Sequence, residues 1–238
     1  SEIAMETVAG LKPWREVVEP HTDVATGDFN QAEFAADLSK VHGGTAASEY
    51  LDPGEFFSRT YLTEGLSVLL KDAAKRLAGD GGDPVVELQT NFGGGKTHSL
   101  LALYHMVGSK KFRDLPGLDQ MMADIELKGE VRRAVLVGTA RGPLDIIKTK
   151  DGLEIRTTWG EMAYQLGGAD GYEMVRKQDE GGIAPGSELL VELFTKFGPC
   201  LILIDEWVAY LRQIYKVDGL PAGTFDANLS FVQSLTEA

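Results

Sequence analysis

The sequence contains one cysteine, no long apolar run, and no basic N-terminal segment followed by an apolar one. The single cysteine, Cys200, stands just before an apolar run, and we expect it to be a buried thiol in a reducing compartment. A membrane-spanning helix needs about 18 or more consecutive apolar residues, and the sequence has no such run. A signal peptide begins with a basic segment followed by an apolar one, and this pattern is also missing. These absences predict a cytoplasmic protein without membrane contact.

Basic residues are also few. The chain has 23 lysines and arginines against 36 aspartates and glutamates, which gives a net charge of −13. A chain that wraps nucleic acid by itself needs a strongly basic face to neutralise phosphates. The small basic groups at 110–113 and 132–133 are expected to be solvated surface. Contact with DNA is therefore expected only through a partner or through regions outside this chain.

The remaining composition is that of an ordinary globular protein, with 43% apolar and 25% charged residues. A length of 238 residues suffices for one large α/β domain with an N-terminal appendage. We expect a helical N-terminal region over residues 1–50 and a core domain over residues 51–238.

Strand-like and helix-like segments alternate along the core. Apolar segments typical of buried strands lie at 85–88, 134–137 and 200–204, and a hairpin is expected between Ile146 and Ile155. Helices are expected from apolar spacing and capping residues at 31–41, from Pro53 through Leu70 with a break near Gly65, and at 100–107, 159–166, 172–177, 187–197 and 226–238. Asp52 is expected to cap the helix that begins at Pro53. Thr158 is expected to cap the helix at 159–166, and Gly167-Gly168 to end it. The alternation predicts a three-layer α/β fold with a mostly parallel sheet. Because the last helix has no stop signal, we interpret the chain as a fragment of a longer protein.

A glycine-rich segment follows the first predicted strand. It approximates the phosphate-binding pattern G-x-x-x-x-G-K-[ST], with Thr90 in place of the first glycine. Three consecutive glycines allow backbone N–H groups to surround a phosphate, and the helix that starts here adds the positive end of its dipole. Lys96 can reach the β- and γ-phosphates of ATP, and the Thr97 hydroxyl can bind Mg²⁺. The expected nucleotide-binding residues are Asn91, Phe92, Gly93, Gly94, Gly95, Lys96, Thr97 and His98.

A second motif, Asp205-Glu206, follows the apolar strand 200–204. Ligands of open α/β sheets bind at the carboxyl ends of the strands. We expect Asp205 to hold Mg²⁺ through its water shell, and Glu206 to orient and deprotonate the attacking water. Taken alone, an acidic pair is often only the start of a loop; beside a phosphate-binding loop it predicts ATP hydrolysis.

Other candidate residues are expected to be structural. His98 and His105 lack a third ligand at metal-binding spacing, and Trp207 is expected to anchor the core. Arg141 and Arg156 are expected to form salt bridges, with an arginine finger as the alternative role of Arg141. The segment 60–63 is expected to pack, with adenine contact as its alternative role.

With these motifs described, the chain resembles a known family, the domain of unknown function 499. The matching stretches are LKPWREVV (11–18), DPGEFF (52–57), RTYLTEGL (59–66), QTNFGGGKTHS (89–99), TWGE (158–161) and IDEWV (204–208). The resemblance implies the N-terminal part of an AAA+-like P-loop ATPase, related to the large ATPases of phage-defence systems. It also implies that a later strand, a sensor residue and a lid domain lie beyond Ala238, so the isolated chain is expected to bind nucleotide weakly or hydrolyse it slowly.

The leading hypothesis is an ATP-binding, Mg²⁺-dependent ATPase module that couples hydrolysis to the remodelling of a protein or nucleic-acid partner, with self-association in the full-length protein. The first alternative is a scaffold that binds ATP as a signal without hydrolysing it. A phosphotransferase is the second, and Glu206 argues against it because a kinase avoids activating water beside the γ-phosphate.

Overall fold

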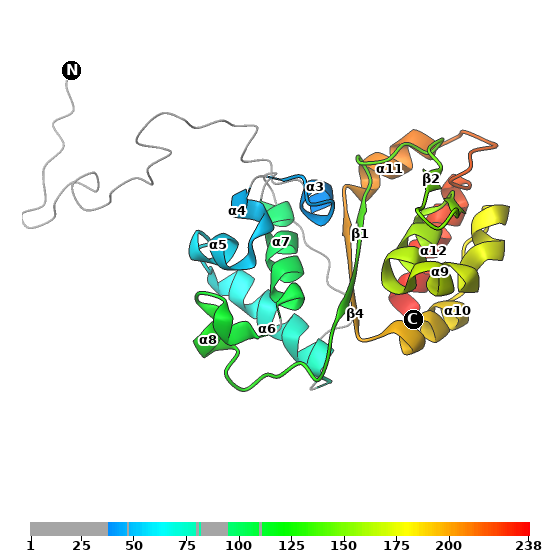
Figure 1. The fold of residues 1–238 in the computed structure, drawn as a ribbon. Coiled ribbons are helices and arrows are strands. Elements are labelled where there is room, and N and C mark those ends of the chain that lie inside the picture. The colour runs from blue at the N-terminus through cyan, green and yellow to red at the C-terminus, as the bar shows by residue number, and fades with distance from the viewer. Residues whose placement is uncertain (1–37, 47, 80, 82–94, 110) are drawn as a thin grey trace, which may run out of the picture. The chain divides into compact units, whose positions relative to one another are not determined.

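The computed structural model describes residues 38–46, 48–79, 81, 95–109 and 111–238 (Figure 1). All of them belong to one compact unit, Ala36–Ala238. The predicted strand at 85–88 and the first part of the predicted helix at 31–41 lie outside the described residues. So do Asn91, Phe92, Gly93 and Gly94 of the glycine-rich segment.

Two parallel strands, β1 (Arg132–Val137) and β4 (Cys200–Asp205), form the centre of the described structure. Arg132 is paired with Cys200 and Val137 with Asp205. Successive side chains point to opposite faces of a strand, and the packing follows this rule: Val135 and Leu203 join one apolar cluster, while Ala134 and Leu136 join the other. The pair is therefore covered on both faces.

The first face is covered by helices from the N-terminal half of the chain, which Figure 1 shows on one side of β1 and β4. These elements are α3 (Leu38–His42), α4 (Ser48–Leu51), α5 (Pro53–Ser58), α6 (Glu64–Ala78), α7 (Gly95–Gly108), the 3-10 turn η1 (Phe112–Asp114) and α8 (Leu118–Met121). Helix α7 contacts both strands, and every one of its residues from Leu100 to Val107 is buried. The strands and these helices thus share one core, which fixes the beginning of α7 relative to the end of β4.

The second face is covered by α9 (Thr158–Gly181), α10 (Ser187–Phe197) and α12 (Phe225–Glu237). Trp159, Leu190 and Phe231 are fully buried in this layer. Helix α11 (Trp207–Ile214) follows β4 directly and was not predicted from the sequence. The described residues thus form a mixed α/β fold with a small parallel sheet, as the alternating segments predicted.

The predicted hairpin is present as β2 (Ile147–Lys148) and β3 (Glu154–Ile155), which pair in antiparallel orientation. Asp179, a fully buried residue of α9, fixes the end of this hairpin. Its carboxylate accepts hydrogen bonds from the backbone N–H groups of Arg156 and Thr157 and from the hydroxyls of Thr157 and Tyr172. One carboxylate therefore joins the end of the hairpin to the N-cap of α9 and to Tyr172 further along the same helix.

Three predicted helix boundaries were wrong. Helix α9 has its N-cap at Thr157, whose hydroxyl accepts from the Gly160 N–H at 3.0 Å, and not at Thr158. Gly167-Gly168 does not stop this helix: Gly168 (φ 59°) only kinks it, because α9 packs on both sides of the kink. The long helix expected after Pro53 is divided at 59–63 into α5 and α6, and Thr63 caps the start of α6.

The predicted Asp52 cap of α5 is confirmed, since the Asp52 side chain accepts a hydrogen bond from the Glu55 N–H at 2.7 Å.

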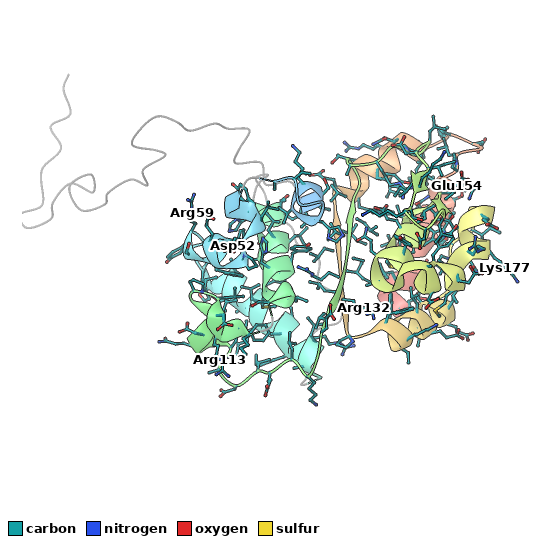
Figure 2. All side chains as sticks on the ribbon, in the orientation of Figure 1. Asp52, Arg59, Arg113, Arg132, Glu154 and Lys177 are labelled. Carbon is teal, nitrogen blue, oxygen red and sulfur yellow. The ribbon has the colours of Figure 1, made fainter. Side chains whose placement is uncertain are left out.

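The basic pair at the start of β1 connects the sheet to both helical layers and is not merely solvated surface. Arg132, labelled in Figure 2, donates to the Leu166 carbonyl at 2.7 Å, on the α9 side. Arg133 donates to the Tyr104 carbonyl at 2.9 Å, and its guanidinium lies 3.9 Å from the Tyr104 ring centroid, on the α7 side. The two arginines follow the same alternation as the apolar strand residues.

The outer edge of β1 is satisfied by a side chain. The Gln165 amide of α9 accepts from the Val135 N–H at 2.7 Å and donates to the Val135 carbonyl at 2.9 Å.

Among the described helices, none is long and apolar enough to cross a membrane.

Candidate nucleotide-binding site

The two chemistry-bearing motifs meet where α7 begins and β4 ends. The Thr97 hydroxyl donates a hydrogen bond of 2.9 Å to Asp205 Oδ2, although the two residues are 108 positions apart in the sequence. Asp205 lies two residues after Leu203 in β4, so its side chain points to the same face of the sheet as those of Leu201 and Leu203, the face that α7 covers. It is 4% exposed. The local fold thus places a hydroxyl and a buried carboxylate together.

Lys96 lies in the first turn of α7, beside Thr97. Its side chain is half-buried and makes no hydrogen bond or ion pair within the described part of the chain. The first N–H groups of a helix have no partner inside the helix and carry a partial positive charge. A free ammonium at such a helix start is suited to bind an anion.

Glu206 has an unusual backbone conformation, with φ 55° and ψ 34°. Its N–H donates to Asp205 Oδ1 at 3.0 Å, so that Asp205 accepts from both Thr97 and Glu206. The Glu206 carbonyl lies against Gly138, the residue after β1, where any Cβ would collide with it. Gly138 is therefore required for this turn, which leaves the Glu206 side chain exposed at the strand end.

The residues present fit a magnesium ion. A buried carboxylate is stable only when paired or metal-bound, and Asp205 has hydrogen-bond donors but no cation beside it among the described residues. Carboxylate and hydroxyl oxygens are ligands that Mg²⁺ prefers. No group of three or more His, Cys, Asp or Glu able to hold a metal is found within the described ranges, so an ion here would depend on Asp205, Thr97, water and a bound phosphate.

The DUF499 N-terminal domain family matches residues 11–238, almost the entire chain. The chain belongs to this family. Among curated proteins and among solved structures, no match to this chain is found.

Arg141 of the DUF499 domain is held in place by several acceptors. It forms a 2.7 Å ion pair with Glu161, and its side chain is only 9% exposed. It also donates to the carbonyls of Thr157, Asp145 and Arg156. The expectation of salt bridging is confirmed, and Arg141 is not available as an arginine finger in this arrangement.

The other aromatic and histidine candidates also pack within the DUF499 domain. Trp207 stacks on Tyr210 with ring centroids 5.4 Å apart, which confirms its role as a core anchor. The His98 ring lies 4.9 Å from that of Phe56, and its Nε2 is 3.3 Å from the Thr60 hydroxyl. His105 is buried, and its Nε2–H donates to the Tyr50 carbonyl at 2.6 Å.

These histidines predict a pH-dependent stability. Burial lowers the pKa of both His98 and His105 below 6.5; for His105 the Tyr50 carbonyl opposes this change. Just below pH 6.5 the unfolded chain therefore binds more protons than the folded chain. The contribution of these neutral histidines to the free energy of unfolding is fully present above pH 6.5, and it falls as the pH drops below this value. The urea midpoint is expected to be lower at pH 5.5 than at pH 7.5. His105→Gln, which can still donate to Tyr50, is expected to reduce the difference, and an unchanged difference would contradict the assignment.

Sequence reasoning missed Gly138, Gln165 and Tyr210. A glycine directly after a buried strand is a signal of close backbone approach, so Gly138 was detectable in principle. Gln165 and Tyr210 carry no such signal, since their roles depend on contacts with distant segments of the DUF499 domain.

Proposed function

We propose that this chain is the ATP-binding module of an AAA+-like P-loop ATPase with a three-layer fold. The observation that carries the proposal is the 2.9 Å hydrogen bond from Thr97 to Asp205. It joins the end of a glycine-rich phosphate-binding motif to the acidic end of a buried strand, which is the arrangement that ATP and Mg²⁺ binding requires. The helices on both faces of β1 and β4 support the three-layer fold.

Each residue of the site has one role in this proposal. Lys96 and the first N–H groups of α7 bind the β- and γ-phosphates. Thr97 and Asp205 hold Mg²⁺, which neutralises phosphate charge when bound. Glu206 accepts a proton from the water that attacks the γ-phosphate. The exposed carboxylate of Glu206 follows Asp205 directly in the sequence, and it forms no hydrogen bond with the Asp205 carboxylate.

The broader role is also a proposal. We propose that the full-length protein is related to the ATPases of phage-defence systems, and that it couples hydrolysis to the remodelling of a protein or nucleic-acid partner. Because Arg141 is tied by four acceptors, an arginine that stabilises the transferred phosphate would come from elsewhere, such as a neighbouring copy. This supports self-association of the full-length protein.

The test is the Glu206→Gln variant, which keeps the shape of the side chain and removes its basicity. We expect ATP affinity to stay within about threefold of the wild type, and phosphate release to fall by about 100-fold or more, the usual contribution of a general base. Glu188→Gln, which changes an exposed carboxylate on α10, is the matched control.

Two outcomes separate the alternatives. Unchanged phosphate release in Glu206→Gln would refute the assignment of the base. ATP binding by the wild type without any phosphate release, in this chain and in the longer protein, would instead favour the nucleotide-sensing scaffold.

A further inference from the structure

A small pocket is lined in part by Gly138, the residue that lies against the Glu206 carbonyl. Its walls include Gly138 and Arg141 from the segment after β1, Glu161 from α9, and Trp207 and Tyr210 from α11. It offers about 10 Å³ to the centre of a water molecule. This is about the smallest space that accommodates one water molecule, provided that two or more polar partners are present.

Two of the residues that line this pocket each carry a polar atom without a hydrogen-bond partner among the described residues. They are Arg141 Nε and Tyr210 Oη, and both are shielded from solvent. Tyr210 as a whole is fully buried. A buried donor without a partner is costly, so such atoms in folded proteins are usually bonded to an internal water.

The charge at the pocket favours a neutral occupant. Arg141 is already neutralised by Glu161 at 2.7 Å, so an anion would meet the Glu161 carboxylate and a cation would meet the Arg141 guanidinium. A water molecule can accept from Arg141 Nε–H and from the Tyr210 hydroxyl, and can donate to the Glu161 carboxylate.

We propose that one water molecule binds here between Tyr210 Oη and Arg141 Nε, and that Tyr210 is thereby a positioning residue for Glu206. Tyr210 contacts the turn directly: its N–H donates to the Glu206 carbonyl at 3.2 Å, and its Cβ lies against Gly138. The water joins the other end of Tyr210 to Arg141, three residues after Gly138. Helix α11 is thus held to the segment after β1 at two points, Gly138 and Arg141.

The experiment for the water site is the Tyr210→Phe variant, which removes one hydroxyl and keeps the ring. If the hydroxyl binds water, its loss leaves that water with one partner fewer, and the folding equilibrium constant is expected to fall by about five- to tenfold. If the hydroxyl has no partner at all, its removal leaves stability unchanged or raises it, which would overturn the proposal. A crystal structure of the wild type should show density within hydrogen-bond distance of both Tyr210 Oη and Arg141 Nε.

Two other tyrosines serve as controls for the same change. Tyr164→Phe removes a bond to Asp151 at the surface and is expected to change the folding constant less than about twofold. Tyr172→Phe removes the buried bond to Asp179 and is expected to lower stability at least as much as Tyr210→Phe.

The positioning role rests on the proposed function, and nucleotide assays test it separately. Tyr210→Phe is expected to leave ATP affinity unchanged and to lower the rate of phosphate release. Unchanged release beside reduced stability would overturn the positioning role and leave the water site standing. If the wild type binds no ATP, the proposed function fails, and the stability change and the crystal structure still decide the water site.

Discussion

An Asp179→Ala variant is expected to lose about 3–5 kcal/mol of its free energy of unfolding. The wild-type carboxylate satisfies four donors from Arg156, Thr157 and Tyr172 inside a fully buried site. Its removal leaves buried N–H and O–H groups without an acceptor and also creates a cavity. Because a typical domain is stable by only about 5–15 kcal/mol, much of the variant is expected to be unfolded at 37 °C.

Urea unfolding followed by circular dichroism measures this loss. The matched control is Glu173→Gln on the same helix, whose carboxylate forms a 2.7 Å ion pair with Arg176 at the surface. An exposed pair of this kind contributes less than about 1 kcal/mol, so the control is expected to behave like the wild type. Equal stability losses in the two variants would contradict the role given to Asp179.

A Lys96→Ala variant is expected to bind ATP at least about 100-fold more weakly than the wild type, which corresponds to about 3 kcal/mol. The ammonium is the one cationic side chain in the first turn of α7, and it has no partner in the described structure. Its loss therefore removes contacts to phosphate without breaking any within the protein, and the unfolding midpoint is expected to stay unchanged.

Isothermal titration calorimetry with ATP and Mg²⁺ measures this affinity. Lys71→Ala, which removes an exposed lysine on α6, carries the same charge change and is expected to retain wild-type affinity. If both variants bind ATP equally well, Lys96 does not contact the phosphates. If neither the wild type nor the variants bind, the proposed function itself is wrong.

Local signals in the sequence were sufficient for several elements. Helix α10 extends over Ser187–Phe197 as predicted, because Gly198-Pro199 ends a well-spaced apolar pattern. Asp52 and Pro53 gave the start of α5, since capping depends on neighbouring residues only. Strand β4 was predicted from its apolar content alone.

Features that depend on distant segments could not be predicted. Gly168 kinks α9 instead of ending it because the packing of α9 continues beyond the kink. Asp179 bonds residues 22 and 23 positions earlier, and no local pattern distinguishes it from a surface carboxylate.

For the site, the motifs predicted that the start of α7 and the end of β4 would meet, and Thr97 and Asp205 do so. The left-handed backbone of Glu206 was not foreseen, because glutamate has no preference for this conformation. It depends on Gly138, which follows the neighbouring strand β1. The glycines at 93 and 94 lie outside the described residues, so their part of the site stays a prediction.

Gln165 has a consequence for how this protein behaves in concentrated solution. An exposed strand edge attracts strands of other molecules and is a common starting point of aggregation. By occupying both backbone groups of Val135, Gln165 blocks the middle of this edge of β1 against an incoming strand. The same amide that completes the fold thereby protects the sheet from pairing at this position.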